Sequence, residues 1–151
     1  MKKNFYTKQG LKDLKEKTEK IISQRPLAVL DLKNAREMGD LSENGYYKAA
    51  KFKLNDIDRT IRRNNYLIKN AEVKEPKDSN SVQIGLTVVL DKNGKRKSLK
   101  IVGSYESNPE EGRISYLSPV GKQLLDGKVG EKIRITVGEN ITIYTIKSIN
   151  Y

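Results

Sequence analysis

Two carboxylates lie close together in the first third of the chain. Asp40 and Glu43 are three residues apart in the stretch REMGDLSEN, which covers residues 36–44. Mg²⁺ prefers hard oxygen ligands and is commonly held by one or two carboxylates together with phosphate oxygens and water. Two acids are too few for a site made by one chain, so a partner's carboxylates and a nucleic-acid phosphate would complete it. Such an ion can make a nucleophile from water and stabilise departing charge in a hydrolysis.

The residue types that are missing narrow the chemistry further. The chain has 151 residues, with 0 His, 0 Cys and 0 Trp. Without cysteine there is no thiol nucleophile, disulfide or thiolate metal site. Without histidine there is no imidazole base, no Ser-His-Asp triad and no zinc site of the usual kind. Any chemistry must therefore rest on carboxylates, Lys, Ser/Thr, Tyr or a borrowed metal.

The same two acids also have a purely structural interpretation. Asp-x-x-Glu at the start of a helix is a capping box, in which Asp40 accepts backbone N–H bonds and Glu43 reaches back to the cap. The local pattern alone favours capping. Capping explains acids at a helix start, but it does not explain why a solvated rod presents them at its far end. Both interpretations stay open on the sequence.

The first half of the chain has the periodicity of a coiled coil. Two series of residues step alternately by three and four, which predicts two helices packed along one seam. Only residues 38–42 separate them, so the helices return antiparallel. Each helix of roughly 28–30 residues spans roughly 40–45 Å at ~1.5 Å per residue. The rest of the chain is too small to cover that length, so the tip is free. The series are Leu11, Leu14, Thr18, Ile21, Arg25, Ala28, Leu32 and Ala35, and Tyr47, Ala50, Leu54, Ile57, Ile61, Asn64, Ile68 and Ala71. The polar core positions Arg25 and Asn64 are expected to fix the register.

From residue 81 onward the period changes to two, which predicts strands. A hairpin turn is expected at Asp91–Gly94, and a short helix over 120–125 with Ser118 as N-cap and Pro119 in the first turn. The predicted fold class is α+β: an antiparallel two-helix coiled coil, then an antiparallel sheet with one short helix. The predicted domains are 1–75 for the hairpin, 76–80 for the linker and 81–151 for the sheet. The predicted strands are Val82–Leu90, Lys97–Val102, Ile114–Leu117, Lys132–Val137 and Ile141–Ile149.

Charge and hydropathy bear on partners and location. Lys+Arg 30 against Asp+Glu 19 gives a net charge of +11, which favours polyanions such as nucleic acid (RNA or DNA), an acidic protein surface or anionic lipid. A solvated surface rich in lysine accounts for the charge equally well. No apolar run approaches ~18 residues and the N-terminus is charged, so we expect a cytoplasmic protein without a membrane association. We also expect a monomer.

Residues around the predicted tip are candidate contacts. Basic side chains along the rod can hold a phosphate backbone, although an exposed coiled-coil position is the more ordinary interpretation of each one. Tyr46 can stack on a base, whereas Tyr47 continues the seam. The candidate contacts to nucleic acid or a protein partner at the tip are Arg36, Ser42, Asn44, Tyr46, Lys48 and Lys51.

The sequence of the predicted tip resembles that of a known protein family. Residues 35–44 (AREMGDLSEN) followed by residues 47–51 (YKAAK) resemble the signature of the bacterial Gre transcript-cleavage factors. The similarity continues in SPVGK at 118–122, in GKVGE at 127–131 and in the closing INY at 149–151. It covers essentially the whole chain. The resemblance implies an N-terminal antiparallel coiled coil and a C-terminal domain of FK506-binding-protein-like (FKBP-like) fold.

The resemblance also implies a function in transcription elongation. The C-terminal domain, with Ser118 and Pro119 as candidate contacts, would dock at the rim of the RNA polymerase secondary channel. The coiled coil would reach down that channel, where its tip residues become candidate contacts to RNA or to the polymerase. There Asp40 and Glu43 would help to hold a Mg²⁺ ion shared with the polymerase, whose own centre cleaves the 3′ end of backtracked RNA. By this inference the chain is no enzyme itself but the activator of another enzyme's nuclease activity.

The departures from the family pattern leave the two carboxylates in place. In the family the residue at Ser42 is often basic, Gly45 is often Ala and Tyr46 is often acidic. The extra tip acids of inhibitory relatives are missing here, which favours a cleavage factor. The alternatives are a non-catalytic secondary-channel binder that modulates or inhibits polymerase, and a plain nucleic-acid-binding coiled coil. A peptidyl-prolyl isomerase is disfavoured because fold alone does not carry function.

Overall fold

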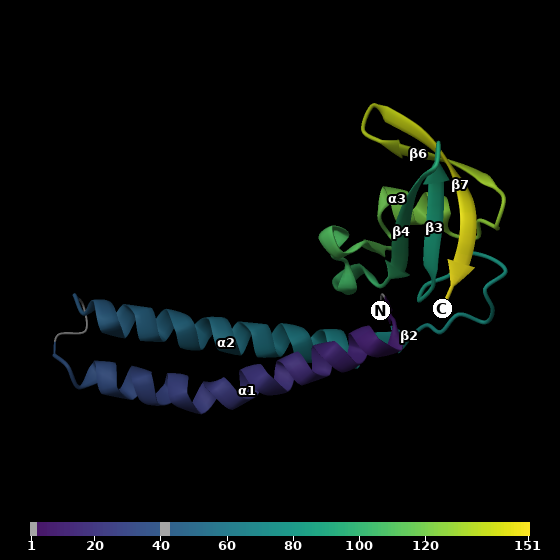
Figure 1. Ribbon diagram of the computed structural model, residues 1–151. Helices are drawn as coiled ribbons and strands as arrows, with labels where there is room; N and C mark the ends of the chain where they lie inside the picture. The colour runs from purple at the N-terminus through teal and green to yellow at the C-terminus, as the bar shows by residue number, and fades with distance from the viewer. Residues whose placement is uncertain (1–2, 40–42) are drawn as a thin grey trace. The chain divides into compact units, whose positions relative to one another are not determined.

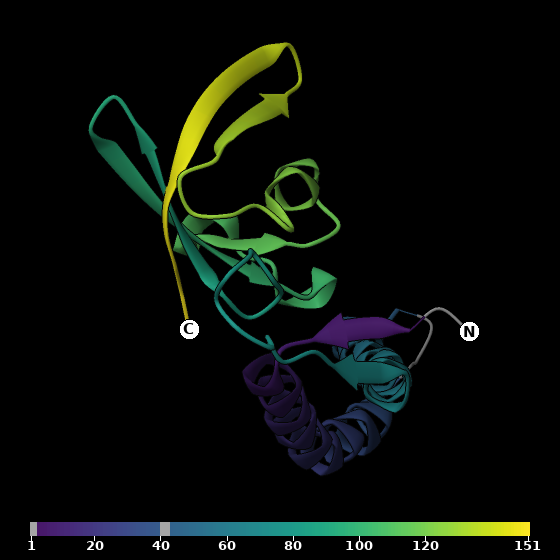
Figure 2. The same cartoon turned by 90° about the vertical axis from the view of Figure 1, so that its right-hand side faces the viewer.

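The computed structural model describes residues 3–39 and 43–151. The chain forms two compact units: a hairpin unit, Lys12–Asn70, and a sheet unit, Met1–Leu11 with Ala71–Tyr151. This division differs from the boundary that the sequence predicts at residue 75. Two short strands cause the difference, β1 (Asn4–Tyr6) and β2 (Ala71–Val73), because they pair in parallel and bring both ends of the hairpin's chain into the sheet unit. Figure 2 shows these two strands side by side.

The hairpin unit is built from two long helices, α1 (Lys8–Arg36) and α2 (Gly45–Lys69). They run antiparallel, side by side (Figure 1). With 29 and 25 residues and about 1.5 Å per residue, they measure about 44 Å and about 38 Å. The antiparallel pair is therefore confirmed, and α2 is shorter than predicted because it begins at Gly45 rather than near Asp40.

The seam between the helices follows the predicted spacing. Of its buried residues only Leu67 lies outside the predicted series; the others are Thr18, Ala28, Ala35, Ile57 and Asn64. The Asn64 Nδ2 donates to Thr18 Oγ1 at 3.0 Å, and that hydroxyl donates to the Leu14 carbonyl oxygen at 2.7 Å. A one-turn slip would leave the buried Asn64 amide without this partner, at a cost of about 1–3 kcal/mol, whereas the Thr18 hydroxyl would keep its bond to Leu14 on the same helix. Asn64 thus fixes the register, as predicted.

Arg25 does not occupy the core position that the spacing predicts for it. Its side chain is 47% exposed, and its Nε lies 2.6 Å from Asp58 Oδ1 on the other helix. A guanidinium is too costly to bury without a partner, and a two-helix seam is open to water along both sides. The hydrogen bond from Arg25 holds the pKa of Asp58 below its ordinary value, and the same bond raises the pKa of Arg25.

The Arg25–Asp58 ion pair should make the stability of the hairpin depend on pH. Because the folded-state pKa of Asp58 is depressed, the pair stabilises the hairpin above the ordinary value of 3.8, and this contribution is lost as the pH falls below it. Urea unfolding should show Asp58→Asn less stable than the parent at neutral pH, with the difference shrinking below pH 3.8. Asp56→Asn, an exposed aspartate of the same helix, serves as the control. A difference that stays constant with pH would contradict the assignment.

The larger sheet of the sheet unit has five strands in the order β5-β4-β3-β7-β6. They are β3 (Thr87–Lys92), β4 (Lys95–Val102), β5 (Arg113–Ser115), β6 (Lys132–Val137) and β7 (Asn140–Asn150). All pairings are antiparallel except β4 with β5, so the sheet is mixed and not wholly antiparallel as predicted. The parallel pair arises because two 3₁₀ turns, Ser104–Glu106 and Pro109–Glu111, carry the chain back before β5 begins.

The predicted first strand is also shorter than expected. Val82 and Leu86 are fully buried, yet the ladder starts only at Thr87. Residues 82–86 are irregular: the Val82 N–H and C=O bond to the Gly127 C=O and the Asp126 N–H, and Gly85 has φ +96°. The apolar residues Val82 and Leu86 are therefore core residues of an irregular segment and not part of a strand.

The core of the sheet unit lies between the sheet and the short helix α3 (Pro119–Leu124), which Figure 1 shows against one face. It includes alternate residues of β3 and β4, as a period of two requires. Ser118 Oγ accepts from the Gly121 N–H at 3.0 Å, which confirms the predicted N-cap. The fully buried large side chains of this core are Val82, Leu86, Val88, Leu90, Ile101, Leu124 and Ile146.

One carboxylate joins the start of α1 to the rest of the sheet unit. Glu106 accepts hydrogen bonds from the backbone N–H groups of Thr7 and Gly103, both at 2.9 Å, and from the Thr7 hydroxyl. Thr7 Oγ1 in turn accepts from the Gly10 N–H at 3.0 Å, as a helix cap does. A Cβ at Gly103 would lie 2.1 Å from the Phe5 carbonyl oxygen, so only glycine fits there.

This close approach predicts the effect of Gly103→Ala. The new methyl would displace the backbone at Phe5 and the Glu106 carboxylate, which should lower the free energy of unfolding by about 1–3 kcal/mol. Gly45→Ala is the matched control, because a Cβ added there would meet nothing within 4 Å and the residue stands in the first turn of α2. That variant should be as stable as the parent or more stable by up to about 1 kcal/mol. Equal stability of Gly103→Ala and the parent in urea unfolding would contradict the packing argument.

Candidate functional site at the hairpin tip

The tip is the connection between α1 and α2, residues 37–44. The chain leaves α1 through Gly39, whose φ of +125° is a conformation that side chains rarely adopt. Asp40 and Ser42, two of the predicted site residues, lie outside the described residues. Glu43 is described and exposed, and it precedes α2 rather than lying within it. Within the described residues no side chain bonds to its carboxylate. Glu43 is therefore accessible to a ligand.

The helix cap at the tip is Asn44, not the predicted capping box. Its Oδ1 accepts from the Tyr47 N–H at 3.2 Å, and its Nδ2 donates to the Ala35 carbonyl oxygen at 3.0 Å. The same amide thus caps the start of α2 and satisfies a carbonyl near the end of α1. In a capping box Glu43 would be the third helical residue, but it stands one position before the cap. The structural interpretation of Glu43 is therefore wrong, because Asn44 fills that role.

Two predicted contact residues gather around Tyr47 on one side of the tip. The Arg36 guanidinium and the Lys51 ammonium each lie 5.9 Å from the centroid of the Tyr47 ring. Such cation–π contacts attract a cation to the ring face within about 6 Å. Tyr47 is half-buried in the seam, as predicted, while Arg36, Lys51 and the neighbouring Lys48 are exposed. This side of the tip therefore presents two cations near one aromatic ring, with a third, Lys48, beside it in sequence.

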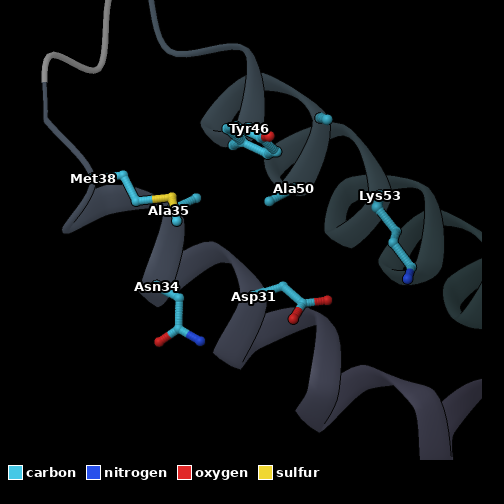
Figure 3. Close-up of a pocket in the computed structure, with 8 residues that line it drawn as sticks. Asp31, Asn34, Ala35, Met38, Tyr46, Ala50 and Lys53 are labelled. Carbon is cyan, nitrogen blue, oxygen red and sulfur yellow. The ribbon is translucent and has the colours of Figure 1, made fainter.

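Tyr46 points in a different direction from Tyr47 and lines a groove of about 340 Å³ between the helices. Figure 3 shows Ala35 of α1, and Met38 in the turn just after it, facing Tyr46 and Ala50 of α2. Tyr46 is 75% exposed and Met38 is 68% exposed. The end of the groove away from the tip carries polar side chains, Asp31, Asn34 and Lys53.

Sequence reasoning did not predict this groove. Its signal lies in three small residues at facing positions, Ala35 on α1 and Ala49 and Ala50 on α2. Coiled-coil knobs as short as alanine leave space that larger side chains would fill. The adjacent pair Ala49–Ala50, next to the exposed Tyr46, could have indicated a hollow.

The remaining predicted contacts lie in the sheet unit. Ser118 is occupied as the N-cap of α3, and its hydroxyl also donates to the Ser115 carbonyl oxygen at 2.7 Å. Pro119 follows as the first helical residue and is exposed. The structure therefore groups Arg36, Glu43, Asn44, Tyr46, Lys48 and Lys51 at one tip and places Ser118 and Pro119 in the other unit.

Acidic side chains do not cluster in the described part of the chain. Residues 3–39 and 43–151 contain no group of three or more acidic side chains that could hold an ion. Glu43 alone offers an exposed carboxylate at the described part of the α2 start, of the oxygen type that Mg²⁺ prefers.

Comparison with known proteins decides the family. The family description "Transcription elongation factor, N-terminal" matches residues 4–73, and "Transcription elongation factor, GreA/GreB, C-term" matches residues 76–151. The chain belongs to the GreA/GreB family of transcription elongation factors. The resemblance seen in the tip sequence is thereby confirmed.

Relatives in this family match along almost the whole chain. Transcription elongation factor GreA of Lachnoclostridium phytofermentans is 39% identical, over 98% of this chain and 96% of the relative. The GreA factor of Nautilia profundicola is 37% identical, over 100% and 96%. Among solved structures, the GreA factor homolog 1 protein of Thermus thermophilus aligns over 99% of this chain and 100% of its own, with a TM-score of 0.47 and 23% identity. The sequence matches alone carry the family assignment.

None of the described helices combines the length and the apolar character that a transmembrane helix needs.

The double role of Asn44 predicts how the tip responds to substitution. Asn44→Ala removes the cap of α2 and the bond to Ala35, and should lower the free energy of unfolding by about 1 kcal/mol or more. Asn44→Asp keeps the acceptor for the Tyr47 N–H and loses only the donor, so its loss should be smaller. Asn55→Ala, at an exposed position inside α2, should be neutral or slightly stabilising in the same urea titration. A loss for Asn55→Ala equal to that for Asn44→Ala would contradict the capping role.

Proposed function

We propose that this chain inserts its hairpin into the secondary channel of bacterial RNA polymerase and stimulates the polymerase's own Mg²⁺-dependent cleavage of backtracked RNA 3′ ends. Arrested elongation complexes would thereby regain a usable 3′ end. Membership of a transcription elongation factor family supports the general role. The channel, the cleavage and the ion are our proposal.

The observation that carries the proposal is the position of Glu43. Its exposed carboxylate lies at the end of a hairpin about 38–44 Å long and is not needed as a helix cap, since Asn44 performs that task. An exposed acid that is not committed to capping is available to a partner. The hairpin is narrow, because the described part of the hairpin unit consists of two helices that share one seam.

The residues of this chain would divide the work as follows. Glu43, together with Asp40, would supply oxygen ligands, and the polymerase would supply the remaining ligands and the substrate. When bound, Mg²⁺ supplies an activated water and stabilises charge on the departing oxygen. Arg36, Lys48 and Lys51 would offset the charge of the RNA backbone beside the tip. Ser118 and Pro119, at the start of α3, are the proposed contacts of the sheet unit with the polymerase.

The test is a cleavage assay on a backtracked elongation complex that carries 3′-labelled RNA. Release of the labelled fragment should depend on both the protein and Mg²⁺. Glu43→Gln keeps the shape of the side chain and removes its charge, so stimulation should fall at least about tenfold, as expected when a metal site loses a ligand. Asp40→Asn should behave alike. Binding to polymerase, measured separately by competition with labelled parent protein, should be retained.

The chain offers a matched control on the same connection. Glu37→Gln removes an exposed acid that lies just after α1, and it should cleave like the parent. Normal stimulation of cleavage by Glu43→Gln would contradict the role of Glu43 as a Mg²⁺ ligand. If the parent binds polymerase and releases no fragment at any Mg²⁺ concentration, the chain is instead a non-catalytic channel binder.

A further inference from the structure

We propose that the groove on the Tyr46 side of the tip binds one unpaired nucleobase of RNA, with Tyr46 as the stacking surface. The inference deepens the proposed function and rests on it for the choice of RNA as the ligand. It concerns a site distinct from Glu43: the groove lies between the helices and is lined by residues of both. Its shape, its lining and the charge around it support the proposal.

The shape suits a small flat group. About 340 Å³ is near the lower end of the range of ligand pockets, which runs from about 300 to 1,000 Å³. The hollow exists because Ala35 and Ala50 face each other across the seam (Figure 3), where larger residues would meet. Ala35 is buried and Ala50 half-buried, so together they form an apolar floor.

The rim of the groove exposes apolar surface that the fold does not use. Tyr46, in the first turn of α2, and Met38, in the turn just after α1, face each other with most of their surface in solvent. Neighbouring exposed apolar side chains around a hollow are typical of a binding site rather than of an ordinary surface. An aromatic ring at such a rim offers a face for stacking, and stacking on tyrosine is a common way to hold an unpaired base.

The polar end of the groove supplies groups that a base edge can use. The Asn34 amide is both donor and acceptor, Lys53 is a donor and Asp31 is an acceptor. All three side chains lie on the exposed surface, so they can turn toward a ligand. An apolar floor with a few convergent polar groups matches the two parts of a nucleobase, its faces and its edge.

The surrounding charge favours nucleic acid over a protein partner. Between residues 48 and 63, α2 carries six basic and two acidic residues, and one of the acids, Asp58, is paired with Arg25. A ribose-phosphate backbone leading to the groove would therefore meet a cationic helix, and the base at its end would meet an apolar pocket. The six basic residues are Lys48, Lys51, Lys53, Arg59, Arg62 and Arg63.

The test uses the full chain without polymerase and a short single-stranded oligoribonucleotide with 2-aminopurine as its 3′ base. Stacking on Tyr46 should quench the fluorescence of that base. Tyr46→Ala should bind about 5- to 100-fold more weakly, the range that loss of one stacked base implies. Tyr46→Phe should bind like the parent, because it keeps the ring. Ala50→Leu, which fills the floor, should weaken binding as Tyr46→Ala does.

Two controls separate stacking from general attraction to a basic helix. Tyr66→Ala removes another exposed tyrosine of α2, far along the helix from the groove, and should leave binding unchanged. An oligonucleotide whose terminal nucleotide lacks its base should bind the parent as weakly as Tyr46→Ala binds the complete one. The same oligonucleotide should show no further loss with Tyr46→Ala, because the two changes remove one contact.

Two results would overturn the proposal. One is equal binding of the complete oligonucleotide by Tyr46→Ala and the parent. The other is a loss of polymerase binding by Tyr46→Ala in the absence of RNA, with oligonucleotide binding intact, which would make the groove a protein-docking site. The proposed cleavage function is contradicted by a different result. If the parent protein binds the oligonucleotide through Tyr46 but stimulates no cleavage, the cleavage function is wrong and the base-binding groove is still supported.

Discussion

The hydrogen bond between Asn64 and Thr18 constrains the whole hairpin. Two helices that share one seam have no second layer to hold them, so their relative register depends on contacts within that seam. Apolar heptad positions tolerate a shift of one turn, because one leucine or isoleucine replaces another. The buried Asn64 amide does not tolerate it, since it would lose its Thr18 partner in a dry environment.

The register that Asn64 sets near one end of the hairpin determines the geometry at the other. Arg25 meets Asp58 in the middle, and Asn44 reaches the Ala35 carbonyl at the tip. Each of these contacts joins α1 to α2, and all of them require the same alignment of the helices. The facing of Ala35 with Ala50, which opens the groove, follows from that alignment as well.

The sequence predicted most of the architecture because periodicity reports which face of an element is buried. The antiparallel helices, the seam, the Asn93–Gly94 hairpin turn, the α3 cap and the β6 strand follow from spacing and turn chemistry. Periodicity gave wrong predictions where a residue with core spacing can be accommodated in more than one way. Arg25 has core spacing but leaves the seam for Asp58, and Val82 and Leu86 are buried without joining a ladder. The parallel β4–β5 pair depends on the path of two 3₁₀ turns, which no local pattern encodes.

At the tip, the sequence identified the residues but not their division of roles. Asp40, Glu43 and Asn44 are all good capping residues, and sequence spacing alone favoured the Asp-x-x-Glu box. The choice between them depends on where α2 begins, and helix ends are the least certain feature of a sequence pattern. Once α2 begins at Gly45, Asn44 is the only one of the three in register with the Tyr47 N–H. The groove could not be predicted from the sequence for a related reason, since a hollow depends on pairs of facing residues rather than on any one of them.

The residues at the start of α2 have two separate roles: some link the two helices, and others are exposed at the tip. Asn44 and Tyr47 point into the hairpin and link the helices, whereas Glu43 and Tyr46, their immediate neighbours, are exposed. A neutral cap leaves the charge of Glu43 uncommitted, which a capping carboxylate would have shared with the helix N-terminus. Adjacent residues on a helix start point in different directions, about 100° apart. A short stretch of sequence can therefore stabilise the hairpin with one set of side chains and present an acid and an aromatic ring to a partner with the other.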